Sequence, residues 1–118
     1  MNWLKRIFKR KEFHKEPRMY IIVRGDLNPV YANIQGAHAL AQFAIDHPKE
    51  FAEWNNKYLI FLKVFNKNAL VDFIKNNTKM MDLAKVPVSC FFEPDLDNQI
   101  TAFALYDTGK FVDGLPLA

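Results

Sequence analysis

The stretch MYIIVRGDLNPVYANIQGAHALAQFAID, residues 19–46, decides the fold class of this chain. It opens with MYIIVRG (19–25), a run rich in apolar and β-branched residues and too short for a helix, which predicts a buried strand. DLNP (26–29) has the composition of a turn, and residues 30–46 follow a helical pattern. A strand joined to a helix by a short turn predicts the first unit of an α/β domain.

The helical segment is expected to bury one apolar face. Five of its residues fall at spacings of three, four, three and one, and we expect them to face the core: Ile34, Ala37, Ala41, Ala44 and Ile45. His47 and Pro48 end this helix. Residues 49–55 are expected to form a short second helix with Phe51 and Trp54 turned inward.

Three further apolar runs predict the remaining strands, namely YLIFLKVF (58–65), VPVSCFF (86–92) and ITAFALY (100–106). Asn66 is expected to cap a helix that runs from Lys67 to about Asn77. The order β-α-(α)-β-α-β-β predicts a four-stranded mixed sheet covered by helices. Only about seven residues join the last two strands, so that pair is expected to be antiparallel. The first two strands are apolar on both faces, which predicts that they lie in the interior of the sheet.

Charge is distributed unevenly along the chain. Residues 1–18 carry seven Lys or Arg and two Glu, whereas residues 19–118 have a net charge of −2. We therefore divide the chain into a basic N-terminal arm (1–18) and a single domain (19–118). The arm has the pattern of a short amphipathic helix, because helical spacing relates its apolar residues Trp3, Leu4, Ile7 and Phe8. Three partners fit this pattern: nucleic acid, an anionic membrane surface, and the protein's own or a neighbouring domain.

Composition excludes several classes of site. A single cysteine, Cys90, excludes an internal disulfide and a thiolate zinc site, and its apolar surroundings predict a buried side chain. The three histidines are not spaced as metal ligands, and the sequence has no Gly-rich phosphate loop and no nucleophile elbow. No apolar run approaches the ~20 residues that span a bilayer, and no signal peptide is recognisable. We expect a cytoplasmic protein without a metal or a cofactor.

Polar residues follow the predicted strands at the edge where ligands gather in α/β proteins. The first strand leads into Arg24 and Asp26, and the third into Glu93 and Asp95 of the acidic turn EPDLDN (93–98). Because the carboxyl ends of parallel strands share one edge of a sheet, these side chains are expected to lie together. A solvated acidic loop is the alternative interpretation of this turn.

The first helix adds further candidates. Gln35 and His38 are three residues apart and share a helix face, and Tyr31 lies one turn before Gln35. A helix histidine commonly bonds to a neighbouring backbone group or carboxylate, which is the simpler interpretation of His38. Placement beside the acidic turn instead predicts a site at which four side chains converge: Asp26, Gln35, His38 and Glu93.

Two segments, IIVRGDL (21–27) and NIQGAHALAQF (33–43), resemble the second class of peptidyl-tRNA hydrolases, the archaeal and eukaryotic type. Those proteins open with an apolar strand ending in V-R-x-D-L, and a helix with the pattern G-K-x-x-x-Q-x-x-H-A follows. The resemblance extends along the chain. EPDLDNQITA (93–102) and GLPLA (114–118) are similar to a short bacterial and phage variant of the family. The resemblance implies that this chain has the fold of that family.

The resemblance also implies an activity, the hydrolysis of the ester that joins a peptide to the 3′ ribose of tRNA. It implies tRNA or a nucleotide-like molecule as the ligand, and no cofactor. Catalysis is assigned to His38, Thr101 and either Glu93 or Asp95, and substrate binding to Arg24, Asp26, Tyr31, Gln35 and Asn98. A carboxylate or His38 would activate water, and N–H groups at the start of the first helix would stabilise the oxyanion.

Two features depart from the family pattern, and one of them is that EPDLDN (93–98) replaces the Asp-Ala-Gly-Arg-Thr loop of the family. The family has a lysine four residues before the glutamine, and Tyr31 occupies that position here. Two alternatives to a hydrolase follow. One is a family member that binds a nucleotide-like or nucleic-acid ligand without cleaving it. The other is a homodimeric accessory protein whose sheet edge or aromatic surface forms the interface.

Overall fold

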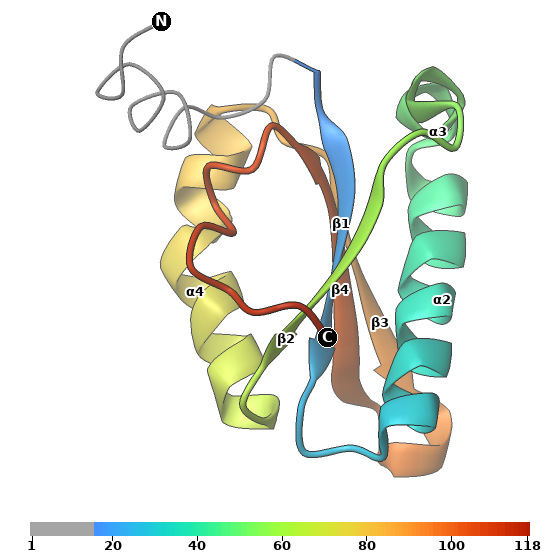
Figure 1. Cartoon of the computed structure of the whole chain (residues 1–118), viewed down its shortest axis with the longest axis vertical. Coiled ribbons are helices and arrows are strands. Elements are labelled where there is room, and N and C mark those ends of the chain that lie inside the picture. Colours follow the sequence, from blue (N-terminus) through green and yellow to red (C-terminus); the bar gives the residue numbers. More distant parts are fainter. Residues whose placement is uncertain (1–15) are drawn as a thin grey trace, which may run out of the picture.

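The computed structural model describes residues 16–118, which form an α/β domain built on one four-stranded mixed sheet (Figure 1). The strands are β1 (Arg18–Arg24), β2 (Leu59–Val64), β3 (Val88–Glu93) and β4 (Gln99–Asp107). The helices are α2 (Pro29–Asp46), α3 (Pro48–Trp54) and α4 (Lys67–Leu83), and a 3-10 turn, η1 (Pro94–Leu96), joins β3 to β4. The predicted α/β class, with a four-stranded mixed sheet covered by helices, is confirmed. Residues 1–15 of the predicted arm lie outside the described residues.

The sheet has the strand order β2-β1-β4-β3. β1 and β2 are parallel, and β4 is antiparallel to both β1 and β3, as the short β3–β4 connection predicts. β1, β2 and β3 therefore end at the same edge of the sheet, and β4 begins there. α2 and α3 cover one face of the sheet and α4 covers the other (Figure 1).

β1 lies in the interior of the sheet, as predicted, but β2 forms an edge, so this part of the prediction is wrong. β2 is apolar because both of its faces are covered: Phe61 packs on the α2 side and Leu62 on the α4 side. Its outer edge is partly paired, since the Lys63 N–H donates to the Pro116 carbonyl at 3.0 Å and the Ala118 N–H donates to the Phe61 carbonyl at 3.0 Å. A strand covered on both faces has the same composition at an edge as in the interior.

The inward face of α2 differs from the predicted one. The buried residues of the helix are Ala32, Gln35, Gly36, Ala39 and Phe43, whereas Ile34 and Ile45 are 49% and 73% exposed. The reason is a close approach to the sheet: a Cβ atom on Gly36 would lie 2.5 Å from Phe61 Cε2 and 3.0 Å from Ile21 Cγ2. Only small residues fit at this crossing, so the branched side chains lie on the outer side of the helix.

The two ends of α4 are fixed by different means. At its start the Asn66 side chain accepts a hydrogen bond from the Ala69 N–H at 2.9 Å, which confirms the predicted cap. At its other end the helix continues to Leu83, past the predicted end near Asn77. Met81 is buried there and anchors the last turns to the core.

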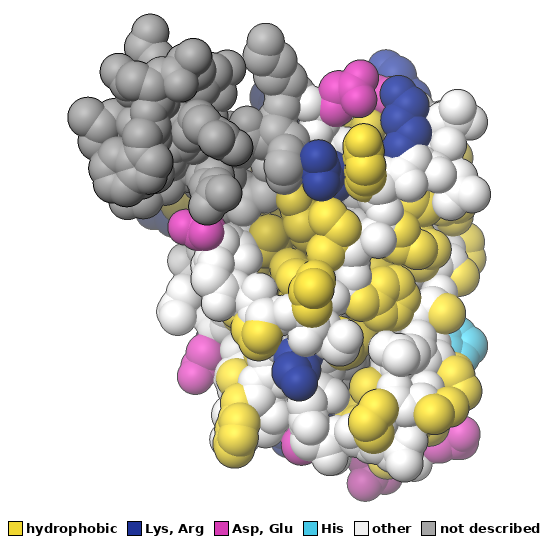
Figure 2. All heavy atoms as spheres, in the orientation of Figure 1, with side chains coloured by type: hydrophobic (Ala, Val, Ile, Leu, Met, Phe, Trp, Pro, Cys, Tyr) yellow, Lys and Arg dark blue, Asp and Glu magenta, His cyan; other side chains and the backbone are white. Residues whose placement is uncertain are grey.

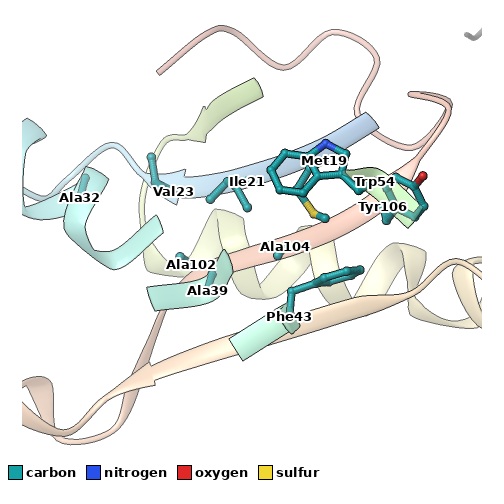
Figure 3. Packing of buried hydrophobic residues seen from close by; sticks show 10 residues of the cluster. All are labelled: Met19, Ile21, Val23, Ala32, Ala39, Phe43, Trp54, Ala102, Ala104 and Tyr106. Carbon is teal, nitrogen blue, oxygen red and sulfur yellow. The ribbon is translucent and has the colours of Figure 1, made fainter. Parts of the chain in front are cut away.

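An apolar core lies on each face of the sheet. The core on the α2 side contains Met19, Ile21, Val23, Ala32, Ala39, Phe43, Trp54, Ala102, Ala104 and Tyr106 (Figure 3). The core on the α4 side contains Tyr20, Ile22, Leu62, Val64, Leu70, Met81, Ile100, Phe103, Leu105 and Val112. Met19, Trp54 and Tyr106 lie together at one end of the first core, far from Ala32 at the other end (Figure 3). The polar residues considered below lie near the end that contains Ala32.

Within residues 16–118, no helix is both long and apolar enough to cross a membrane.

Candidate functional site

A buried polar cluster lies between α2 and the ends of β3 and β4. Glu93 Oε1 accepts hydrogen bonds from the Tyr31 hydroxyl at 3.2 Å and from Gln35 Nε2 at 3.3 Å. The Thr101 hydroxyl donates to Gln35 Oε1 at 2.6 Å. Gln35, Glu93 and Thr101 are 1%, 9% and 0% exposed. Four of the predicted site residues, from three separate segments of the chain, therefore form one hydrogen-bonded cluster. We call it the Glu93 cluster.

A β-bulge turns Thr101 toward this cluster. Phe91 pairs with Ala102 while Phe92 pairs with Ile100, so Thr101 is the extra residue on β4. Ala102 belongs to the core on the α2 side, and simple alternation would place Thr101 on the opposite face. The bulge interrupts the alternation and brings the Thr101 hydroxyl to Gln35. The run ITAFALY does not reveal this interruption.

Tyr31 acts as a hydrogen-bond donor within the cluster. Desolvation of its hydroxyl raises the pKa of Tyr31 above the usual value of 10.0, and the charge of Glu93 and the hydrogen bond to it raise this pKa further. The hydroxyl therefore keeps its proton at neutral pH, and the Glu93 carboxylate is the acceptor. Tyr31 thus contributes a neutral hydrogen-bond donor to the cluster.

His38 lies beside the cluster but does not join it. Its ring stacks on Phe91, with the ring centroids 4.6 Å apart and an angle of 10° between the planes. Phe91 is two residues before Glu93 on β3, so His38 and Glu93 are on the same face of the sheet. The His38 side chain is exposed and, within residues 16–118, makes no hydrogen bond.

Arg24 and Asp26 form a second, separate group. The Arg24 guanidinium donates to both Asp26 carboxylate oxygens, at 3.1 and 2.8 Å, and its Nη1 donates to Gln99 Oε1 at 3.0 Å. Arg24 alternates with Tyr20 and Ile22, which face α4, so this group is on the other face of the sheet from Gln35. The hydrogen bond from Arg24 lowers the pKa of the Asp26 carboxyl below its usual value. The predicted convergence of Asp26 with Gln35 and His38 is therefore wrong.

Of the acidic turn, residues 93–98, only Glu93 contributes a side chain to the cluster. Glu93 enters the cluster, whereas the side chains of Asp95 and Asn98 are exposed and make no hydrogen bond within residues 16–118. Asn98 has a positive φ of 56°, and its backbone N–H donates to the Glu93 carbonyl at 3.0 Å, which closes the turn. Of the two carboxylates considered from the sequence, Glu93 is the one that the fold places beside Gln35.

Sequence reasoning missed a second polar contact between α2 and β3. The Ser89 hydroxyl donates to Asp46 Oδ2 at 2.7 Å, and Gln42 Nε2 donates to Asp46 Oδ1 at 2.9 Å. The hydrogen bonds from Ser89 and then Gln42 lower the pKa of Asp46. The signal was present in the sequence as a polar stripe at spacings of four, three, four and four: Tyr31, Gln35, His38, Gln42 and Asp46.

A cavity of about 860 Å³ opens on the α4 side, between the ends of β1 and β2 and the start of α4. Its walls include Gly25, Val64, Phe65, Ala69 and Leu115. Asp26, which belongs to the Arg24 group, also lines the cavity. The cavity does not include any residue of the Glu93 cluster. No group of three or more His, Cys, Asp or Glu side chains within residues 16–118 could hold a metal ion.

Comparisons with known proteins give a fold and no activity. No protein-family model and no curated protein matches the chain. Among solved structures, the chain is similar to a protein of unknown function from Agrobacterium tumefaciens strain C58, with 13% sequence identity and a TM-score of 0.60. The similarity covers 87% of this chain and 98% of the other. At this level of identity, the likeness establishes a shared α/β fold.

Proposed function

We propose that this protein is a peptidyl-tRNA hydrolase-like enzyme that cleaves the ester between a peptide and the 3′ ribose of tRNA. The resemblance of the VRGDL and QGAHA segments to the family motifs suggests the activity. One observation carries the proposal: Gln35, Glu93 and Thr101, three positions implied by that resemblance, meet in the buried Glu93 cluster. The cluster lies at the edge of the sheet where α/β proteins place their ligands.

Glu93 is the proposed general base. Tyr31 and Gln35 hold one of its oxygens, Oε1, and within residues 16–118 no group donates to the other, Oε2. Oε2 is therefore able to accept a hydrogen bond from a water molecule and remove its proton as the oxygen attacks the ester carbonyl. The proton then passes from Glu93 to the 3′ oxygen of the ribose as the carbon–oxygen bond breaks.

Gln35 and Thr101 are proposed as positioning residues. The Thr101 hydroxyl fixes the orientation of the Gln35 amide, and the amide nitrogen in turn fixes the Glu93 carboxylate. The start of α2 is poor in donors for the oxyanion, because Pro29 has no N–H and the Val30 N–H bonds to Asn28 Oδ1 at 3.0 Å. The Tyr31 hydroxyl does not replace these N–H groups, because its one proton is donated to Glu93.

The proposed substrate is a polyanion, and the charge of the chain suggests how it is held. Residues 19–118 are mildly acidic, so contacts to the tRNA phosphates are assigned to the basic arm, residues 1–18. Removal of the arm is expected to weaken tRNA binding and to flatten the dependence of log affinity on log salt concentration, because fewer counterions are released.

Hydrolysis of an N-acetylated aminoacyl-tRNA by the purified protein tests the proposal. Wild type is expected to release the acylated amino acid, and Glu93→Gln is expected to lower kcat by about a hundredfold or more, as loss of a general base does. Asp95→Asn is the matched control, because its carboxylate lies outside the cluster, and it is expected to retain wild-type kcat. Equal loss of kcat in both variants, or no effect in either, would contradict the role given to Glu93.

The position of Tyr31 favours a second candidate, a protein that binds the same ligand without cleaving it. The Tyr31 hydroxyl completes the Glu93 cluster without the cation that the family has at this position. In that case wild type binds the acylated tRNA but does not hydrolyse it. Tyr31→Lys is then expected to raise the rate roughly ten- to a hundredfold, which is the value of one charge-assisted hydrogen bond. The rate of the wild-type protein decides between the two candidates.

A further inference from the structure

The outer face of α2 is apolar and uncharged. From Pro29 to Ile45 the helix has no Lys, Arg, Asp or Glu. Val30 is 70% exposed, Ile34 and Ile45 are also exposed, and so are Ala37 and Ala41 between them. Hydrophobic and uncharged side chains occupy the part of the surface that α2 forms (Figure 2). These residues are the ones whose periodicity predicted a buried face.

The face differs from that of a helix that packs on one side only. α4 is such a helix, and its outward side carries exposed charged residues, among them Asp72, Lys75 and Lys79. α2 buries Ala32, Ala39 and Phe43 against the sheet and has a second apolar face directly opposite. A helix that is apolar on both sides is normally buried on both sides. The outer face of α2 therefore has the composition of an interface.

We propose that the outer face of α2 forms a homodimer, in which two copies of the helix pack antiparallel about a two-fold axis. The pattern Ile34-Ala37-Ala41-Ile45 has spacings of three, four and four, so it is nearly the same in both directions along the helix. Antiparallel packing then places Ala37 opposite the partner's Ala41, and Ile34 opposite the partner's Ile45. A two-fold interface requires this self-complementarity, and the central alanines allow the helices to approach closely.

The outer face of α2 carries no charge. Asp46, the only charged residue of α2, lies at its C-terminal end, and its carboxylate accepts hydrogen bonds from Ser89 and Gln42 on the side toward β3. The second copy is thus a better occupant than an anionic or cationic partner, for which the face offers no counter-charge.

The area of this face determines how tightly two copies of the chain are expected to bind each other. A helix of 18 residues is about 27 Å long, and one of its sides offers on the order of 500 Å². Stable complexes bury about 800 Å² on each partner, so the expected dimer is weak, with a dissociation constant in the micromolar range. The polar stripe toward β3, with Gln35 and Gln42, lies about a quarter turn away around the helix, and His38 lies between that stripe and the outer face. The proposal rests on the apolar residues of the outer face and not on the contacts of the Glu93 cluster.

Sedimentation of the full chain over a wide range of concentration tests the proposal. The mass of wild type is expected to rise toward that of a dimer, and Ala37→Glu is expected to weaken association at least tenfold. The double variant Ala37→Glu with Ala41→Lys is expected to associate again, because each new carboxylate faces a new ammonium of the partner. Asn76→Glu, on the exposed side of α4, is the matched control and is expected to leave association unchanged.

Disulfide cross-linking tests the direction of packing. Mixed Ala37→Cys and Ala41→Cys proteins are expected to form a disulfide between the two proteins, and each alone is expected to cross-link poorly. The wild-type protein, whose single cysteine is Cys90, shows how much cross-linking this residue causes by itself. Efficient cross-linking of each variant with itself would overturn the antiparallel arrangement. A wild-type monomer at every concentration would overturn the proposal, and so would a dimer that Ala37→Glu does not weaken while its circular dichroism remains that of wild type.

Discussion

α2 and α4 cover opposite faces of one sheet, and they contact it with different kinds of residue. α2 approaches the sheet closely through Gly36 and Ala39 and buries the amide of Gln35. α4 packs through Leu70 and Met81 and leaves more space, with a cavity of about 860 Å³ at its start and another of about 400 Å³ along its second half. Contacts between helix and sheet are thus tight on the α2 side and looser on the α4 side.

The difference suggests a division of roles between the two faces. Gln35 must reach Thr101 and Glu93 at the same time, and a small displacement of α2 would break one of these hydrogen bonds. Close contact at Gly36, one residue away, fixes the helix in the required position. α4 has no such polar contact to maintain, and it contributes mainly apolar surface to stability.

The largest expected effect is on packing at Gly36. Gly36→Leu would force a side chain into a space where even a Cβ atom is too close to Phe61, and we expect unfolding free energy to fall by about 2–3 kcal/mol. Ala69→Leu is the counterpart on α4, where the residue lines the large cavity, and it is expected to change stability by less than about 0.5 kcal/mol. Urea unfolding measures both. Equal losses would remove the contrast between the two faces.

The next effect concerns the buried hydrogen bonds on the α2 side. Gln35→Leu leaves the Thr101 hydroxyl without its acceptor and Glu93 with one donor fewer, so a loss of about 1–3 kcal/mol is expected. Adding Thr101→Val removes the unsatisfied hydroxyl and is expected to recover part of this loss. A double-mutant cycle on unfolding free energy measures the coupling. Strict additivity of the two changes would mean that the bond contributes nothing to stability.

The smallest effect is that of pH on Asp26. The Arg24 guanidinium lowers the pKa of this carboxyl below 3.8, so the folded state binds its proton more weakly than the unfolded state does. The stabilisation that the Arg24–Asp26 ion pair gives to the folded state is therefore complete above about pH 4. It is lost as the pH falls through the lowered pKa of Asp26 in the folded state. Because the Asp26 side chain is 38% exposed, Asp26→Asn is expected to lower stability at pH 7 by less than about 1 kcal/mol.

Unfolding curves from pH 7 into the acid range measure this prediction. The difference between wild type and Asp26→Asn is expected to shrink as the pH falls below about 4 and to vanish below the lowered folded pKa of Asp26, where the carboxyl is protonated in the folded wild type as well. Asp113→Asn, at another exposed carboxylate, is the control for a general change in charge. A difference that persists unchanged at the lowest pH would exclude the ion pair as its cause.

Local patterns in the sequence predicted those parts of the fold that depend on neighbouring residues. The β1 and β4 runs, the turn at 26–29 and the Asn66 cap all follow from residue type and spacing. Topology then predicted that Glu93 would approach Gln35, because parallel strands end at one edge of the sheet. The resemblance added Thr101 to that group.

The remaining features depend on contacts between distant segments. The apolar pattern of α2 has two candidate faces, and only the position of Phe61 against Gly36 decides which one packs on the sheet. The edge position of β2 depends on strand order, which its composition does not encode. Arg24 is separated from Gln35 by the thickness of the sheet, and one residue of register decides the face.

The bulge at Thr101 has a consequence for protein design. Deleting one residue between Ile100 and Ala102 would give β3 and β4 an uninterrupted ladder, which is the regular geometry that designers favour for stability. The same deletion would remove the hydroxyl that orients Gln35. An idealised version of this domain could thus be more stable than the natural one and still lack an ordered Glu93 cluster.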